Sequence, residues 1–123
     1  MTTLILPYPP STNANYRHTR RGVMLAPAVK KFRQEIAEYV EQVWPMCFRP
    51  MQGDLHVEIL LAQPARRRRR DIDNPIKPLL DALTHAGVWG DDSQVVQLLV
   101  QFAAPGTPEG ATVKILTAPP SAL

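Results

Sequence analysis

Thirteen prolines in 123 residues limit the fold more than any other feature of this sequence. Proline lacks a backbone N–H and fixes φ, so it disrupts the interior of a helix and of a central strand. Most of the prolines stand near segment ends: Pro7, Pro9 and Pro10; Pro45 and Pro50; Pro105 and Pro108; Pro119 and Pro120. This distribution argues against an ordinary helical bundle and marks the boundaries of shorter segments.

Between these boundaries, hydrophobic spacing predicts four strands and two main helices. Alternation predicts a half-buried strand over residues 55–62, and an apolar stripe predicts a helix over about residues 28–44. The stripe consists of Val29, Phe32, Ile36, Tyr39, Val40 and Val43. Further strands are expected over residues 3–6, 95–103 and 111–117, the last two joined by a long hairpin loop over residues 105–110. Residues 8–22 are expected to form a polar loop.

The second helix is expected after the acidic stretch. Asp73 or Asn74 is a candidate cap with Pro75 as first helical residue, but Pro78 cannot donate the first intrahelical bond. We therefore expect a loose first turn, regular helix over residues 78–85, and an end at Gly87. The order of elements predicts an α+β fold, with helices packed against a mixed sheet of about four strands. One domain is expected over residues 1–118, followed by a loose tail over residues 119–123.

The charge of the chain is uneven. The net charge is only +3, yet Arg66, Arg67, Arg68, Arg69 and Arg70 are consecutive, and five of the six aspartates follow within residues 71–92. Such a basic run fits a polyanion, of which nucleic acid is the commonest, although a merely solvated stretch is the alternative. The lone Cys47 excludes an internal disulfide and fits a reducing cytoplasm. We expect no membrane span, signal peptide or Cys-based zinc site.

Two acidic pairs flank the second helix. In extended chain Asp71 and Asp73 would point the same way, and two carboxylates about 4 Å apart repel by about 4 kcal/mol at an effective dielectric of 20. A divalent cation such as Mg²⁺ turns that repulsion into attraction. The alternative is that these aspartates neutralise the arginines and cap the helix. Lys77 lies one helical turn from both Asp73 and Asp81, and its alternative role is an ordinary ion pair with Asp81.

The second pair, Asp91 and Asp92, falls in an expected turn, and turn formation is its alternative role. Eight helical residues carry the chain away by about 12 Å, whereas residues 87–91 span at most about 17 Å. The return to Asp73 is therefore feasible through an extended loop. A second subunit that supplies the acids is the other solution.

The stretches PYPPSTNANYRHTRRG, RRRRRDIDN, KPLLDALTHAGVWGDD and SQVV resemble the RusA family of Holliday junction resolvases, which are phage- and prophage-associated endonucleases. The resemblance covers most of the chain from Leu4 to about Val100. It implies a Mg²⁺-dependent homodimer, with Mn²⁺ as a substitute, that resolves four-way DNA junctions in recombination and repair by paired symmetric nicks. The site residues that it implies are Asp71, Asp73, Lys77 and Asp92 as catalytic residues, with the three aspartates and additionally Asp91 as metal ligands.

The resemblance also extends to DNA contacts. Besides the five arginines, Asn13, Tyr16 and Arg17 lie in the stretch that looks like the early motif of the family, and a structural role is the alternative. Two other functions stay open at this point. One is a non-catalytic module that binds branched DNA, and the other is a nuclease with broader specificity for flaps, forks or RNA.

Overall fold

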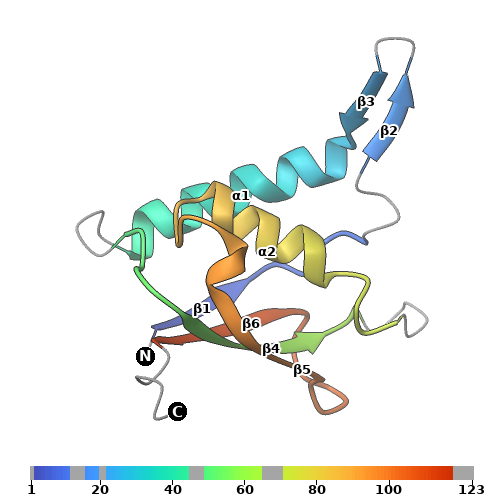
Figure 1. Ribbon diagram of the computed structural model, residues 1–123. Coiled ribbons are helices and arrows are strands. Elements are labelled where there is room, and N and C mark those ends of the chain that lie inside the picture. Colours follow the sequence, from blue (N-terminus) through green and yellow to red (C-terminus); the bar gives the residue numbers. More distant parts are fainter. Residues whose placement is uncertain (1, 12–15, 20–21, 45–48, 65–70, 118–123) are drawn as a thin grey trace.

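The structure is a computed structural model that describes residues 2–11, 16–19, 22–44, 49–64 and 71–117, and of two short strands within these ranges only the backbone. A four-stranded mixed sheet lies under two helices that cover one of its faces (Figure 1). The strands are β1 (Thr2–Leu6), β4 (Leu55–Ala62), β5 (Val95–Phe102) and β6 (Gly110–Thr117), and the helices are α1 (Pro27–Val43) and α2 (Ile76–His85). The α+β prediction is confirmed.

The strand order is β1-β6-β4-β5. β6 is antiparallel to both β1 and β4, whereas β4 and β5 run parallel. The predicted hairpin between the last two strands is therefore wrong, because β4 lies between β5 and β6. Strands that follow one another in sequence usually pair. Here β4, whose apolar face is buried, lies between β5 and β6 instead.

The core lies between the sheet and the helices. From β4 it receives Leu55, Val57, Ile59 and Leu61, and from α1 Val29, Phe32, Ile36 and Val40. The alternation in β4 and the stripe in α1 are thus confirmed, except that Val43 at the end of the stripe is 50% exposed. Val43 is the last residue of the helix, and the buried side chains of its last turn and C-cap are Val40 and Trp44.

A second, two-stranded sheet pairs β2 (Tyr16–Thr19) with β3 (Gly22–Leu25). This hairpin stands away from the main sheet beside the start of α1 (Figure 1). The prediction of a loop over residues 8–22 is wrong there. Residues 16–25 lack the alternating apolar residues from which a strand is predicted, because the hairpin does not lie against the core.

The end of α2 positions the candidate site. Gly87 has a φ of +81°, which glycine adopts without strain, and its N–H donates to Thr84 while that of Val88 donates to Leu83. This capping confirms the predicted end at Gly87. The helix itself begins at Ile76, two residues earlier than expected, because Leu79 donates its N–H to Pro75 and Pro78 falls within the first turn, where no N–H is needed.

Candidate active site

Asp71 and Asp73 lie in a turn that leads into α2. The N–H of Asn74 donates to the carbonyl of Asp71 at 3.2 Å, and that of Ile76 to the carbonyl of Asp73 at 3.1 Å. The extended conformation expected for these two residues is therefore wrong. Both side chains are exposed, and no ion pair holds either carboxylate among the described residues. The residue at the N-cap of α2 is Pro75, and not Asp73 or Asn74 as expected.

Lys77 connects α2 to the second acidic pair. Its Nζ lies 2.8 Å from Oδ1 of Asp81 and 3.3 Å from Oδ2 of Asp92. The hydrogen bond to Asp81 is the main reason why the pKa of Lys77 is raised, and Asp92 adds to it. The chain after Gly87 thus returns far enough within one subunit to bring Asp92 to Lys77, near the start of α2.

Asp91 and Asp92 have different roles in the short 3₁₀-helix η3 (Asp92–Gln94). The side chain of Asp91 caps this helix by accepting from the N–H of Ser93 at 3.3 Å, and this bond lowers the pKa of Asp91. The side chain of Asp92 instead faces Lys77 and is 32% exposed. Asp91 therefore stabilises the turn, while Asp92 keeps carboxylate oxygens available at the site.

Gln94 holds this turn in place, a role that the sequence reasoning missed. Its Oε1 accepts from the N–H groups of Gly90 and Asp91, while its Nε2 donates to the carbonyls of Met51 and Gly53, both at 2.9 Å. The side chain thus ties the acidic turn to the loop that precedes β4. A signal was present, because a residue such as aspartate followed three positions later by glutamine is the pattern of a capping box.

Not all predicted site residues come together. Lys77 joins Asp81 and Asp92, but within the part of the chain that the structure describes no group of three or more His, Cys, Asp or Glu side chains could hold one metal ion. All eleven acidic residues belong to that part. A shared ion between Asp71, Asp73 and Asp92 therefore stays a prediction, and so does the role of Asp91 as a further ligand.

The predicted DNA contacts lie mostly outside the described residues. This applies to Asn13 and to Arg66, Arg67, Arg68, Arg69 and Arg70. Tyr16 and Arg17 belong to β2, where they pair with Leu25 and Met24. Trp89 is buried in the core and donates its Nε1–H to Oγ1 of Thr84.

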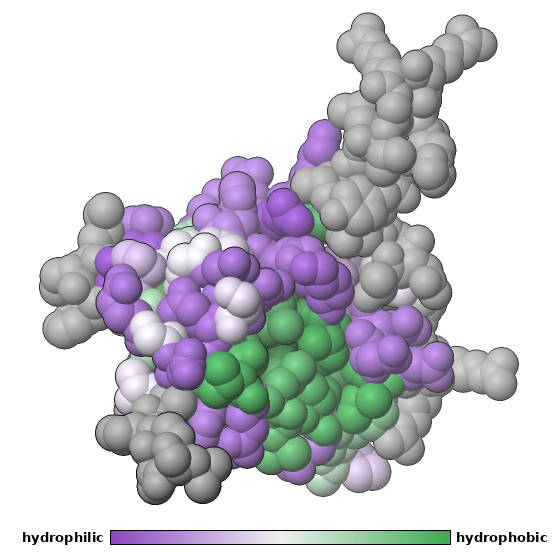
Figure 2. All heavy atoms as spheres, in the orientation of Figure 1, coloured by the Kyte–Doolittle hydropathy of each residue, from purple (hydrophilic) through white to green (hydrophobic). Residues whose placement is uncertain are grey.

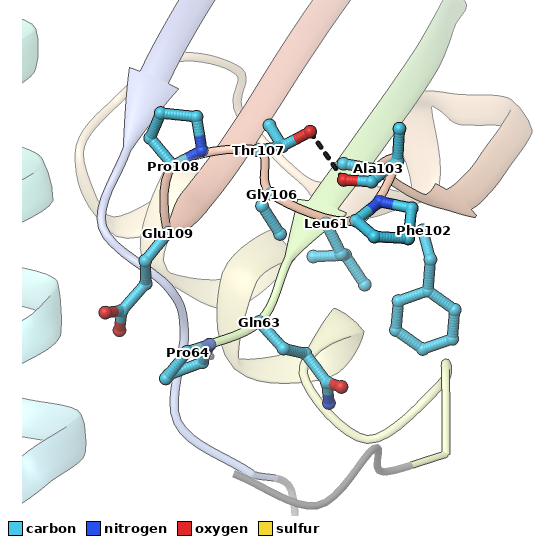
Figure 3. Close-up of a pocket in the computed structure, with 12 residues that line it drawn as sticks. Leu61, Gln63, Pro64, Phe102, Ala103, Gly106, Thr107, Pro108 and Glu109 are labelled. Carbon is cyan, nitrogen blue, oxygen red and sulfur yellow. Dashed lines mark hydrogen bonds between the residues drawn. The ribbon is translucent and has the colours of Figure 1, made fainter. Parts of the chain in front are cut away.

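One hollow of the described surface, about 930 Å³, lies at the end of β5 that is opposite Asp92. The ends of β4 and β5 line it together with the loop between β5 and β6, including Leu61, Gln63, Phe102 and Thr107 (Figure 3). Asp92 precedes β5, so this hollow is at the opposite end of that eight-residue strand, about 26 Å away along it. Its lining carries one acidic residue, Glu109, and no group suited to phosphate hydrolysis.

No helix of the described chain is long and apolar enough to cross a membrane.

Comparison with known proteins adds independent information. Residues 7–116 match the family described as Endodeoxyribonuclease RusA. The chain is 36% identical over 98 residues to the crossover junction endodeoxyribonuclease RusA of Escherichia coli (strain K12), a match that covers 80% of this chain and 79% of that protein. It is 36% identical over 97 residues to the crossover junction endodeoxyribonuclease rusA of Enterobacteria phage 82, covering 79% of this chain and 78% of the relative.

Proposed function

The chain belongs to the RusA family of endodeoxyribonucleases, and from this premise we propose that it resolves four-way DNA junctions by paired symmetric nicks. The observation that carries the proposal is the placement of Lys77 within 3.3 Å of Asp92, one helical turn after the exposed Asp73. An ammonium group beside available carboxylates suits a reaction in which negative charge grows on a phosphate. Recombination and repair are the processes that such an activity serves.

Nucleases of this family depend on a divalent cation, and we propose Mg²⁺, with Mn²⁺ as a functional substitute. The donor set fits, because Asp71 and Asp73 are exposed carboxylates without a cationic partner among the described residues, and Mg²⁺ prefers such oxygen ligands. These two would hold the ion together with Asp92 of the same subunit or of the partner; within one chain the described residues do not bring three such carboxylates to one point. When bound, it supplies a Lewis acid that polarises the phosphoryl group and activates a water.

The side chains of the chain supply the remaining functions. Lys77 stabilises the charge that develops on the scissile phosphate. The five arginines before Asp71 grip the flanking phosphates with their planar forks, so that the acids and the cations face the same DNA backbone. With Arg67 and Arg69 replaced by Ala, the slope of log affinity against log salt concentration should fall by about one for each phosphate that the protein no longer neutralises. An unchanged slope would show that the run does not touch DNA.

We propose a homodimer, since a four-way junction has two-fold symmetry and two strands must be cut. The exposed surface of β5 suits a second copy of this chain. β5 is an edge strand without charged residues, and Val96, Leu98 and Leu99 are 55%, 42% and 50% exposed. Figure 2 shows a continuous hydrophobic area, bordered by hydrophilic residues, on the side of the molecule that β5 forms. Soluble proteins usually protect such an edge with lysine or proline.

The sequence of β5 matches itself in antiparallel pairing. With the two-fold axis at Leu99, Leu98 would lie opposite the partner's Val100, and Gln97 opposite the partner's Gln101. Leu99→Lys should therefore give monomers in sedimentation experiments and abolish paired nicking. Ile5→Lys is the matched control, because Ile5 is 68% exposed on β1, the other edge strand. Dimers that persist in the Leu99→Lys variant would exclude this surface.

Two arrangements complete the acidic site: Asp92 acts within its own subunit, or it acts with Asp71 and Asp73 of the partner. Mixed dimers of Asp73→Asn and Asp92→Asn subunits separate them. If the site is shared, each mixed dimer has one intact site and regains single nicks. If the site lies within one subunit, both sites of every mixed dimer are defective and no cleavage returns.

The first experiment is a panel of labelled four-way, flap, fork, linear and RNA substrates with Mg²⁺. Resolution of the four-way junction with little cutting of linear duplex supports the proposal. Equal cutting of all substrates supports a broader nuclease. Binding of the four-way junction without cleavage in Mg²⁺ or Mn²⁺ supports a non-catalytic module.

A further inference from the structure

Four charged side chains of alternating sign form one line across α1, α2 and η3. Nη2 of Arg33 lies 3.8 Å from Oδ2 of Asp81, whose Oδ1 lies 2.8 Å from Nζ of Lys77. The same Nζ lies 3.3 Å from Oδ2 of Asp92. The two carboxylate oxygens of Asp81 therefore contact cations on two different helices. Oδ1 contacts Lys77 on α2, and Oδ2 contacts Arg33 on α1.

Burial distinguishes this line from an ordinary surface ion pair. The side chains of Asp81 and Arg33 are 17% and 22% exposed, whereas that of Lys77 is 58% exposed. The pair Lys31–Glu35 has the same spacing along its helix but is 3.9 Å apart, with exposures of 80% and 44%. In the middle of the line, Asp81 is thus the more buried partner, and Lys77 is the partner that reaches solvent.

From this geometry we propose that Asp81 is a positioning residue that orients the ammonium group of Lys77 toward the reacting phosphate, and that Arg33 fixes Asp81. A lysine side chain loses much rotamer freedom when it is held in one place, so an unheld Lys77 would reach the phosphate in only a fraction of its conformations. A charged partner on the second oxygen prevents Asp81 from rotating away. Nε of Arg33 is buried and makes no hydrogen bond with any described residue, and the guanidinium contacts Asp81 through Nη2.

The inference rests on the proposed nuclease function, and single-turnover cleavage of a four-way junction tests it in the full-length protein with Mg²⁺. Asp81→Asn keeps the size of the side chain and removes its charge. We expect at least a roughly tenfold fall in the cleavage rate with junction affinity within about twofold of the wild type. Arg33→Gln should give a smaller fall in the same direction. Glu35→Gln, which breaks the surface pair on α1, should leave both quantities unchanged.

A merely structural role of Asp81 predicts different results. If Asp81 acts through Lys77, adding Asp81→Asn to Lys77→Met should cause no further loss of rate, because the residue to be positioned is absent. An additional tenfold loss in that background, or an unchanged rate in the single variant, would overturn the proposal. Thermal unfolding of each variant shows whether a loss of rate reflects loss of the folded protein.

A second readout does not depend on cleavage. In proton–nitrogen NMR spectra the ammonium group of Lys77 should give a resolved signal in the wild type, because a held group exchanges slowly with water. The signal should broaden in Asp81→Asn and persist in Glu35→Gln. If the signal behaves in this way while the wild type cuts no junction, the proposed nuclease function is wrong and the positioning of Lys77 by Asp81 is supported. If Asp81→Asn leaves the signal unchanged, the positioning role fails regardless of activity.

Discussion

The two acidic pairs carry the same charges but use them differently. Asp71 and Asp73 lie exposed in a turn where only their backbone atoms make hydrogen bonds among the described residues. In the second pair, Asp91 accepts from the N–H of Ser93 and Asp92 faces Lys77. A carboxylate that caps a helix uses its oxygens for the fold, whereas one that is exposed, or that lies beside the solvent-reaching Lys77, keeps oxygens for a ligand. Local hydrogen bonding, and not acidity alone, therefore separates structural from catalytic aspartates here.

The largest effect should follow from the exposed pair. Asp73→Asn should lower the rate of junction cleavage by about a thousandfold, equivalent to about 4 kcal/mol of transition-state stabilisation, because a metal ligand is lost. Junction binding and the free energy of unfolding should stay close to those of the wild type, since Asp73 uses only its backbone in the fold. Asp54→Asn, at another exposed aspartate, is the control. Substantial cleavage by Asp73→Asn would place the metal site elsewhere.

Asp92→Asn should lower cleavage by at least about a hundredfold, measured in the same single-turnover assay. It removes both a proposed ligand and one of the two carboxylates beside Lys77. Asp91→Asn is the matched variant in the same turn, and it should cleave at nearly the wild-type rate because asparagine caps a helix as well as aspartate does. Equal losses in both variants would contradict the division of roles within the pair.

The sequence alone predicts some of these structural features and not others. The spacing of apolar residues predicted β4 and α1, and Gly87 predicted the end of α2, because each of these features depends on local sequence. The strand order and the β2–β3 hairpin were not predictable in this way, since they depend on which strands meet in the folded chain. The line from Arg33 to Asp92 was also out of reach. Its residues are separated by 59 positions, and only the packing of α1 on α2 brings Arg33 to Asp81.

Gln94 tests whether the fold of the turn matters to the site. Gln94→Ala removes four hydrogen bonds, two of them to carbonyls of the loop before β4. We expect a loss of about 2 kcal/mol in the free energy of unfolding, measured by urea denaturation, and slower cleavage because Asp92 is held less firmly. Gln52→Ala is the control, since Gln52 is exposed and donates only to the carbonyl of Pro50. Unchanged stability in Gln94→Ala would show that the turn is held by other contacts.

The smallest effect should come from Asp91, and it is the sharpest test of the comparison. Asp91→Ala removes the cap of η3, whereas Asp91→Asn retains an oxygen that accepts from the N–H of Ser93. The alanine variant should therefore unfold at a slightly lower temperature than the wild type, and the asparagine variant at nearly the wild-type temperature. Neither should approach the cleavage defect of Asp92→Asn. If Asp91→Asn were fully stable but inactive, its charge would be needed at the metal, and both acids of the second pair would count as ligands.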